Sequence, residues 1–97
     1  MTAYLVGRAL IHDPLEYNKY IEGVGPLIAR YQGKVLARGG DFRIMEGPQK
    51  FKRFIVIEFP SLEHAQGFFT CDDYNKAAIH RRNGAGEVET VIVEGIA

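Results

Sequence analysis

Cysteine is almost missing from this sequence: Cys71 stands alone, so an internal disulfide is excluded. Net charge is missing too, because twelve Lys and Arg balance twelve Asp and Glu. Binding to nucleic acid or to an anionic membrane needs a basic surplus or patch, which this composition does not supply. No stretch approaches the roughly 18 apolar residues of a membrane-spanning helix. We therefore expect neither a nucleic-acid nor a membrane partner.

The amino terminus lacks the charged-then-apolar layout of a signal peptide. Together with the single cysteine, this favours a reducing, cytoplasmic location. The length, 97 residues, is typical of one domain, and the 46% share of apolar residues is that of an ordinary globular protein. We expect a single domain over residues 1–97, of a size at which a partner subunit adds useful buried surface.

Apolar periodicity predicts four strands and two helical regions. Strands are expected over residues 3–11, 34–38, 52–59 and 88–94. The first helix begins with an Asp13 cap and Pro14, bends near Pro26 and ends with Gly33 as its C′ residue. The second begins after Ser61, breaks at residues 70–73, continues from Tyr74 to Ile79 and closes at residues 83–84.

The segment between the second and third strands contains a Gly-Gly pair, a Gly-Pro pair and several apolar residues. Gly39 and Gly40 indicate a bulge rather than a strand end, because Phe42, Ile44 and Met45 resume a strand pattern. Gly47-Pro48 then turns the chain. These residues predict a hairpin that extends the second strand.

The order strand, helix, strand, strand, helix, strand is that of a ferredoxin-like α+β fold, with helices on one face of an antiparallel sheet. The third strand is nevertheless apolar on both faces: Ile55, Ile57 and Phe59 alternate with Phe54 and Val56. The face without helices must be covered by something. A second copy of the chain is the simplest cover, so we expect a homodimer through the sheet face.

The chain resembles the bacterial domain-of-unknown-function family numbered 1330, within the dimeric α+β barrel superfamily. The resemblance spans almost the whole chain and rests on the following segments: Asp13-Pro14 with Tyr17 and Tyr20, Arg38-Gly39-Gly40, Glu46-Gly47, residues 56–65, Tyr74, Arg81 and Val93-Glu94-Gly95. It implies two sheets packed into a barrel by dimerisation, and it implies no particular reaction.

Two positions depart from the usual pattern of that family. Phe68-Phe69 stands where relatives usually have Trp-Tyr, and Cys71 stands where they usually have Ser. If these positions line a pocket, the pocket is less polar than in the relatives and carries a thiol. We expect Phe68, Phe69 and Tyr74 to surround one pocket or core wedge beside the sheet, and Arg81 to reach the mouth of the barrel as a further ligand-binding candidate.

Strand parity selects the catalytic candidates. It groups Leu5, Ala9, Val91 and Val93 with the helices, and it groups the following on the opposite face: Tyr4, Val6, Arg8, Phe54, Val56, Glu58, Ile92 and Glu94. Antiparallel pairing then predicts a row of Tyr4, Glu58 and Glu94, with Arg38 beside Glu58. Such a cluster in an apolar barrel can hold or move a proton on a small ligand. The alternative is a structural ion pair that seals the end of the barrel.

The remaining polar residues point less clearly to chemistry. The spacing of His12, His64 and His80 matches no metal template, so we expect no metal ion and no cofactor. Cys71 precedes two aspartates, which disfavour the thiolate, so a bystander role is the main expectation and a nucleophile the minor one.

Three functions remain open from the sequence. The first is a cofactor-free enzyme that acts on a small organic molecule by acid/base chemistry in a barrel cavity, as some members of the superfamily do. The second is a non-catalytic module that binds a small metabolite, and the third is a purely structural dimer. A hollow interior separates the first two from the third, and turnover separates the first from the second.

Overall fold

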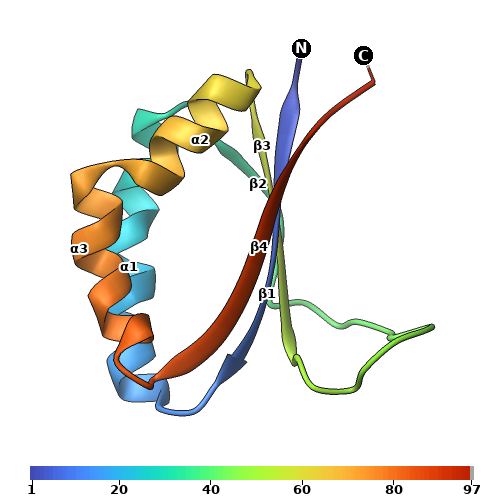
Figure 1. Ribbon diagram of the computed structural model, residues 1–97, viewed down its shortest axis with the longest axis vertical. Helices are drawn as coiled ribbons and strands as arrows, with labels where there is room; N and C mark the ends of the chain where they lie inside the picture. The colour runs from blue at the N-terminus through green and yellow to red at the C-terminus, as the bar shows by residue number, and fades with distance from the viewer. Residues whose placement is uncertain (97) are drawn as a thin grey trace.

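In the computed structural model, which describes residues 1–96, these residues form a four-stranded antiparallel sheet and three helices (Figure 1). The elements are, in order, β1 (Ala3–Ile11), α1 (Pro14–Arg30), β2 (Lys34–Arg38), β3 (Arg53–Phe59), α2 (Leu62–Thr70), α3 (Asp72–Arg82) and β4 (Gly86–Glu94). The strand order is β2-β3-β1-β4, so β1 and β3 are central. The predicted ferredoxin-like α+β fold is confirmed.

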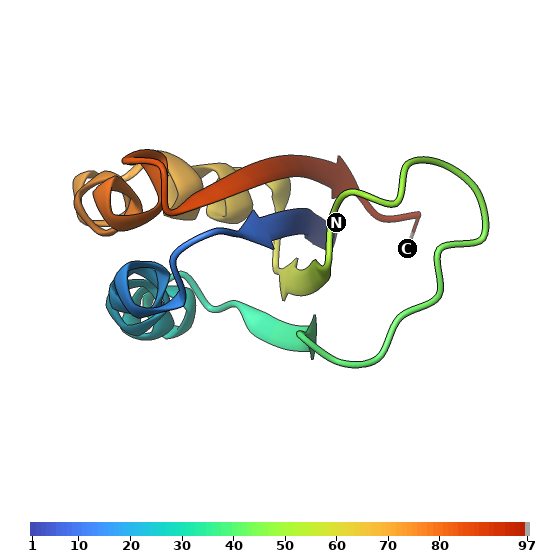
Figure 2. The same cartoon turned by 90° about the horizontal axis from the view of Figure 1, so that it is seen from below.

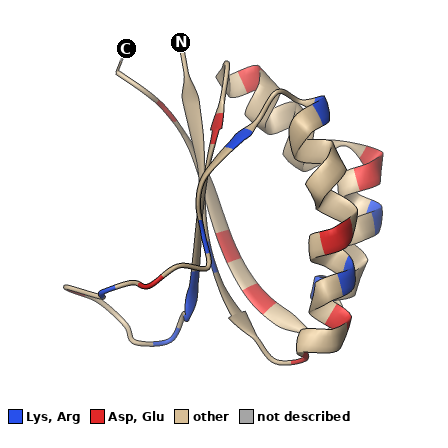
Figure 3. Ribbon diagram, turned by 180° about the vertical axis from the view of Figure 1, so that it is seen from behind, with Lys and Arg blue, Asp and Glu red and all other residues tan. Residues whose placement is uncertain are grey.

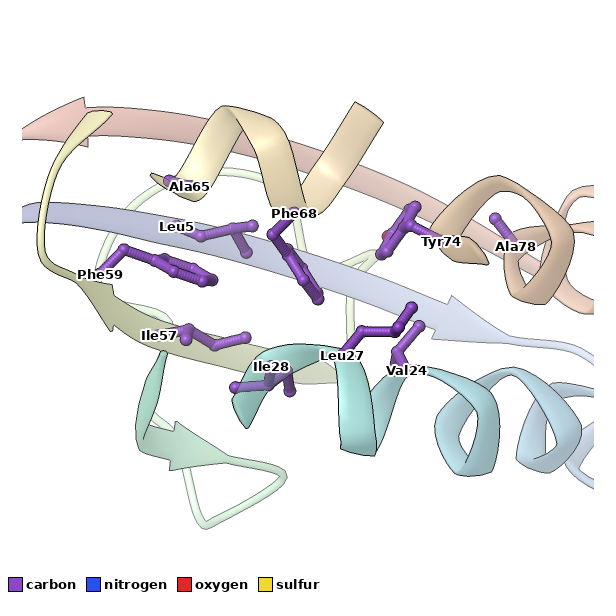
Figure 4. Packing of buried hydrophobic residues seen from close by; sticks show 10 residues of the cluster. All are labelled: Leu5, Val24, Leu27, Ile28, Ile57, Phe59, Ala65, Phe68, Tyr74 and Ala78. Atoms are coloured by element: carbon purple, nitrogen blue, oxygen red, sulfur yellow. The ribbon is translucent and has the colours of Figure 1, made fainter. Parts of the chain in front are cut away.

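All three helices lie on one face of the sheet, and the other face carries no helix (Figure 1). We call these the inner and the outer face. Small and apolar side chains of β1 and β3 point inward, among them Leu5, Ala9, Ile57 and Phe59. Leu5, Ile57 and Phe59 meet Phe68 of α2, Tyr74 of α3 and the apolar stripe of α1 in one buried cluster (Figure 4), whereas Ala9 packs with Tyr17 and Ala85 in a second one. The two clusters fix the helix layer on the sheet through apolar burial.

Helix α1 begins as predicted but ends one residue earlier than expected. Asp13 Oδ1 accepts a hydrogen bond from the Glu16 amide at 3.2 Å, and Pro14 occupies the first turn. The left-handed residue after the helix is Gln32, with φ 61°, not Gly33. Gly33 is needed for space instead, because a Cβ there would lie 2.8 Å from Cγ2 of Ile28 and 2.9 Å from the ring of Phe59.

The predicted extension of β2 is wrong. The strand ends at Arg38, and residues 39–52 form neither strand nor helix. The bulge lies earlier, between Val35 and Ala37, whereas Gly39 has φ 67° and turns the chain out of the sheet. Residues 39–52 project on the side away from the helices (Figures 1 and 2). They return at Phe51, which is buried.

Two caps produce the expected break in the second helical region. Ser61 Oγ accepts a hydrogen bond from the His64 amide at 3.1 Å and starts α2. Cys71 has extended backbone angles, and its Sγ accepts a bond from the Tyr74 amide at 3.3 Å, which starts α3. The turn between them directs Phe68 and Tyr74 into the same core, where their rings pack edge to face at 5.1 Å.

The side chains of β4 that face inward are those predicted to face outward, and the reverse. Val93 pairs with Tyr4 and Val91 with Val6, so both valines share the outer face with them. Ile92 pairs with Leu5 and therefore lies inside. The run Val91-Ile92-Val93 is apolar at every position, so alternation alone does not say which residues face inward; only the register with β1 decides it.

Charges of both signs are interspersed along the helices, the strands and residues 39–52 (Figure 3). Among the described residues, no helix has the length and apolar character needed to cross a membrane.

Candidate functional site

A cavity of about 60 Å³ lies between the inner face of the sheet and the helices. Three small residues form part of its floor: Gly7 and Ala9 of β1 and Thr90 of β4. Its walls come from Tyr17, Tyr20, Ile21 and Val24 of α1 and from Phe68, Phe69 and Tyr74 of the other two helices. Small residues on the floor opposite large ones on the walls leave a gap that the core cluster does not fill. At this volume the gap holds water, and an organic molecule enters only if lining side chains move or if it extends past the rim.

Three arginines border this cavity and no carboxylate does: Arg38, Arg53 and Arg8, whose side chain pairs with Glu89. Arg53 of β3 lies opposite Ala9, and Arg38 of β2 lies opposite Ile55, so both belong to the inner face. Neither forms an ion pair with a described residue, and the buried Nε of Arg53 has no hydrogen-bond partner there. The left-handed turn at Gly39 makes room for Arg53, whose Nη1 would be 2.8 Å from a Cβ at that position. The rim therefore carries uncompensated positive charge.

A further arginine lies behind two tyrosines of the wall. Arg81 is only 7% exposed, and its Nη2 donates to the Tyr74 hydroxyl at 3.1 Å. The hydroxyls of Tyr74 and Tyr20 are 2.9 Å apart, and the guanidinium carbon of Arg81 lies 5.1 Å from the centre of the Tyr20 ring. We call these three residues the Arg–Tyr–Tyr cluster. Its cation is held by hydroxyl and aromatic groups rather than by a carboxylate.

Burial keeps Tyr17 and Tyr20 of the wall protonated. It raises the pKa of Tyr20 far above its usual value, and the neighbouring Tyr74 hydroxyl raises it further. Burial also raises the pKa of Tyr17, although Arg81 and Arg53 partly oppose this. These hydroxyls are hydrogen-bond donors at neutral pH and not bases. The cavity can therefore stabilise an anionic oxygen within an apolar enclosure, which is how enzymes and binding proteins hold carboxylates, phenolates and enolates.

The predicted catalytic row is only partly assembled. Tyr4 and Glu58 are direct cross-strand partners on the outer face, as expected. The predicted neighbourhood of Arg38 and Glu58 is wrong, because Lys34 lies opposite Glu58 and the bulge after Val35 puts Arg38 opposite Ile55 on the inner face. The prediction for Glu94 is wrong too, because Glu94 pairs with Ala3 and therefore lies on the inner face, away from Tyr4. The bulge in β2 separates Arg38 from Glu58, and the register of β4 separates Glu94 from Tyr4; strand parity in the sequence detects neither.

The predicted ligand-binding residues lie together. Phe68, Phe69 and Tyr74 line the cavity, with the ring of Tyr74 5.1 Å from Phe68 and 4.7 Å from Phe69. Arg81 is in contact with Tyr74 from α3, behind the wall rather than at a barrel mouth. The sequence analysis missed Arg53, although its parity with Ile55, Ile57 and Phe59 marks a cation on an otherwise apolar face.

The histidines have local partners. His12 bonds to Glu87, His64 to Ser61 and His80 to Glu16, at 2.7–2.8 Å. Among residues 1–96, no group of three or more His, Cys, Asp and Glu side chains could hold a metal ion. Cys71 is half-buried, and its Sγ donates to the Phe68 carbonyl at 3.3 Å, so its observed contacts are those of a helix cap.

Fold and cavity together define a ferredoxin-like α+β protein with a hollow between its sheet and its helices. The chain belongs to the family described as domain of unknown function (DUF1330), whose sequence model matches residues 2–96. Among curated proteins, none matches the sequence.

Solved structures show the same fold at low sequence identity. A protein of unknown function from Rhodopseudomonas palustris has a TM-score of 0.78 and 18% identity, with 99% of this chain and 83% of that one covered. SnoaB, a cofactor-independent oxygenase from Streptomyces nogalater, has a TM-score of 0.65 and 13% identity, with 99% and 94% covered. A dimeric ferredoxin-like protein of unknown function from Bacteroides fragilis has a TM-score of 0.65 and 14% identity, with 97% and 96% covered.

Proposed function

We propose that this protein binds a small, largely apolar organic anion in the cavity between its sheet and its helices. The observation that carries the proposal is the lining: Arg38 and Arg53 at the rim, three tyrosines in the wall and no carboxylate. An arginine fork matches a carboxylate or an enolate oxygen pair, and the phenylalanines accept an apolar body. The absence of acidic groups from the lining removes the repulsion that would exclude such a ligand.

A second candidate function is cofactor-free chemistry on the bound molecule. It is supported by the fold shared with SnoaB, which is a cofactor-independent oxygenase, and by a cavity able to stabilise a developing oxyanion. The cavity lining contains neither carboxylate nor histidine, so the protein's contribution there is anion stabilisation rather than proton abstraction. Tyr4 and Glu58 stay candidates for acid/base chemistry on the outer face, in a space that only a second copy would enclose.

The protein also assembles, in this proposal, as a homodimer through the outer face and works in the cytoplasm. The support is the exposed valine set on that face: Val6 at 39%, Val91 at 59% and Val93 at 52% exposed. A stable twofold interface buries about 1,200 Å² or more. Sedimentation at micromolar concentration tests it, and a folded monomer there contradicts it.

The binding proposal is tested with matched aromatic acids and amides. Benzoate and salicylate are compared with benzamide and salicylamide by thermal shift and by saturation-transfer NMR. We expect the acids to raise the melting temperature and to receive saturation from the protein's methyl protons, and the amides to do neither. Equal behaviour of acids and amides, or no binding by either, contradicts an anion site. Turnover under air by any bound acid then separates the enzyme from the binding module.

A further inference from the structure

The lining of the cavity is most exposed at one side of the molecule. Of the residues that line it, only Gly25 of α1 and Arg38 of β2 are exposed, whereas Gly7, Ala9 and Phe68 are buried. Helix α1 and strand β2 lie on the same side of the molecule, and α2, α3 and β4 lie on the other (Figure 2). We call the part of the lining at Gly25 and Arg38 the entrance.

Gly25 differs from the other glycine in the middle of α1. A Cβ at Gly23 would lie 2.9 Å from Cβ of Ala77, so Gly23 lets α1 and α3 approach closely. A Cβ at Gly25 would have no neighbour within 4 Å, and the φ of Gly25 is not positive, so neither packing nor a left-handed backbone requires a glycine there. Pro26 supplies a local reason, because proline disfavours a helical residue with a Cβ before it. That reason does not involve a ligand, so ligand binding separates it from a role at the cavity.

The two inner-face cations of the lining lie at this entrance. Arg38 is exposed there, and Nη1 of Arg53 would be 2.8 Å from a Cβ at Gly39, the residue after Arg38. The guanidinium of Arg53 is therefore beside the end of β2. A carboxylate is compensated best at the entrance, whereas an apolar group is best buried against the aromatic wall farther in.

We infer that the ligand enters between Gly25 and Arg38 with its apolar end first and keeps its carboxylate at the entrance, beside Arg38 and Arg53. The inference rests on the proposed binding function and deepens it, because it says which end of the anion the cavity takes and which residue limits its size. A cavity of about 60 Å³ takes only part of such a molecule, so the carboxylate end extends past the rim. The missing side chain of Gly25 leaves the space through which the molecule passes, so Gly25 determines specificity for ligand size.

The entrance is tested with Gly25→Leu and with benzoate as the probe. The added side chain occupies the open space at the entrance, so benzoate affinity should fall about tenfold or more. Ala29→Leu is the matched control, because Ala29 is exposed on the same helix and lies outside the lining, and it should leave the affinity within about twofold. Thermal melts without ligand check that both variants fold. If Gly25→Leu does not fold beside Pro26, the same substitution is made in a Pro26→Ala background and compared with Pro26→Ala alone. Unchanged affinity in the folded variant overturns the entrance.

The orientation is tested with a benzoate that carries a bulky para group. If the ring enters first, this group points into the closed end of the cavity, so 4-tert-butylbenzoate should bind wild-type protein at least about tenfold more weakly than benzoate. A ligand that entered with its carboxylate first would leave the group outside, so equal or tighter binding of 4-tert-butylbenzoate overturns the orientation while the binding proposal stands. Failure of the wild-type protein to bind either acid overturns the binding proposal and this inference together.

Discussion

The two faces of the sheet treat arginine differently. On the outer face, Arg8 is paired with Glu89 at 2.6 Å and lies 4.4 Å from the centre of the Phe51 ring. On the inner face, Arg53 has a buried nitrogen without a partner, although it is the residue that pairs with Ala9, next to Arg8 in β1. Neighbouring positions of one sheet thus carry a satisfied cation and an unsatisfied one.

The faces differ in apolar surface as well. The inner face has its apolar side chains covered by the helices and leaves a cavity at its smallest residues, Gly7 and Ala9. The outer face presents Val6, Val91 and Val93 without a cover from this chain. The inner face therefore lacks an anion, whereas the outer face lacks an apolar partner. We assign the ligand to the inner face and the second copy of the chain to the outer face.

The largest expected effect is on the inner side. Replacing Phe68 by Ala removes a side chain that packs on Phe59, Tyr31 and Tyr74. It should lower the free energy of unfolding by about 3–5 kcal/mol, as measured by urea denaturation. Val91→Ala on the outer face, studied below the dissociation constant of the dimer, is the matched control and should cost far less. Equal costs would mean that the two faces are buried alike within one chain.

On the outer face, replacing Val91 by Asp should convert the dimer to a folded monomer. A carboxylate at the centre of an apolar interface must be desolvated without a partner, which interfaces tolerate poorly. Sedimentation velocity measures the change, and circular dichroism checks that the fold persists. Leu15→Asp is the control, because Leu15 is exposed on the far side of α1. If that variant dissociates too, or if Val91→Asp stays dimeric, the dimer does not form through this face.

Arg53 and Arg30, an ion-paired arginine of α1, give a smaller and more diagnostic contrast. Arg53→Met should not lower the melting temperature without ligand, because it removes an unpaired buried polar atom. It should abolish stabilisation by benzoate. Arg30→Met, outside the cavity lining, should instead cost up to about 1 kcal/mol through its ion pair with Asp73 and leave benzoate binding unchanged. A loss of stability in Arg53→Met, measured by the same thermal shift assay, would show that the inner face is already balanced.

Sequence patterns predicted where helices and strands begin and end better than which face of the sheet each side chain occupies. Caps at Asp13 and Ser61 and the break before Tyr74 are local signals, so helix starts were found closely. The aromatic wall followed from spacing on one helical region, and Phe68, Phe69 and Tyr74 do lie together. Such features depend on nearby residues, which a sequence displays directly.

What failed depends on register between distant strands. A single bulge after Val35 moved Arg38 to the inner face, and the register of β4 reversed the roles of Val93 and Glu94. A shift of one residue exchanges every side chain between faces, and nothing local to either strand announces it. The cavity was beyond prediction for a related reason, since it needs Gly7 and Thr90 to meet across two strands.

The smallest expected effect concerns how the helix layer is fastened at its solvent side. Glu16 of α1 accepts hydrogen bonds from Lys19 and Asn83 and contacts His80 at 2.7 Å, so it ties the start of α1 to the end of α3. The bond with His80, followed by those with Lys19 and Asn83, lowers the pKa of Glu16 to about 2 from 4.5. A carboxylate whose pKa is lower in the folded state stabilises the fold above its unfolded pKa, and that contribution disappears as the pH falls.

The melting temperature of wild-type protein should therefore exceed that of Glu16→Gln above pH 4.5, and the difference should shrink to nothing as the pH approaches 2. Thermal melts followed by circular dichroism at pH steps across this window measure it, with Glu22→Gln on the same helix as the control that should show no such trend. A constant difference at all pH values would mean that the shape of the Glu16 side chain, rather than its charge, holds the two helices together.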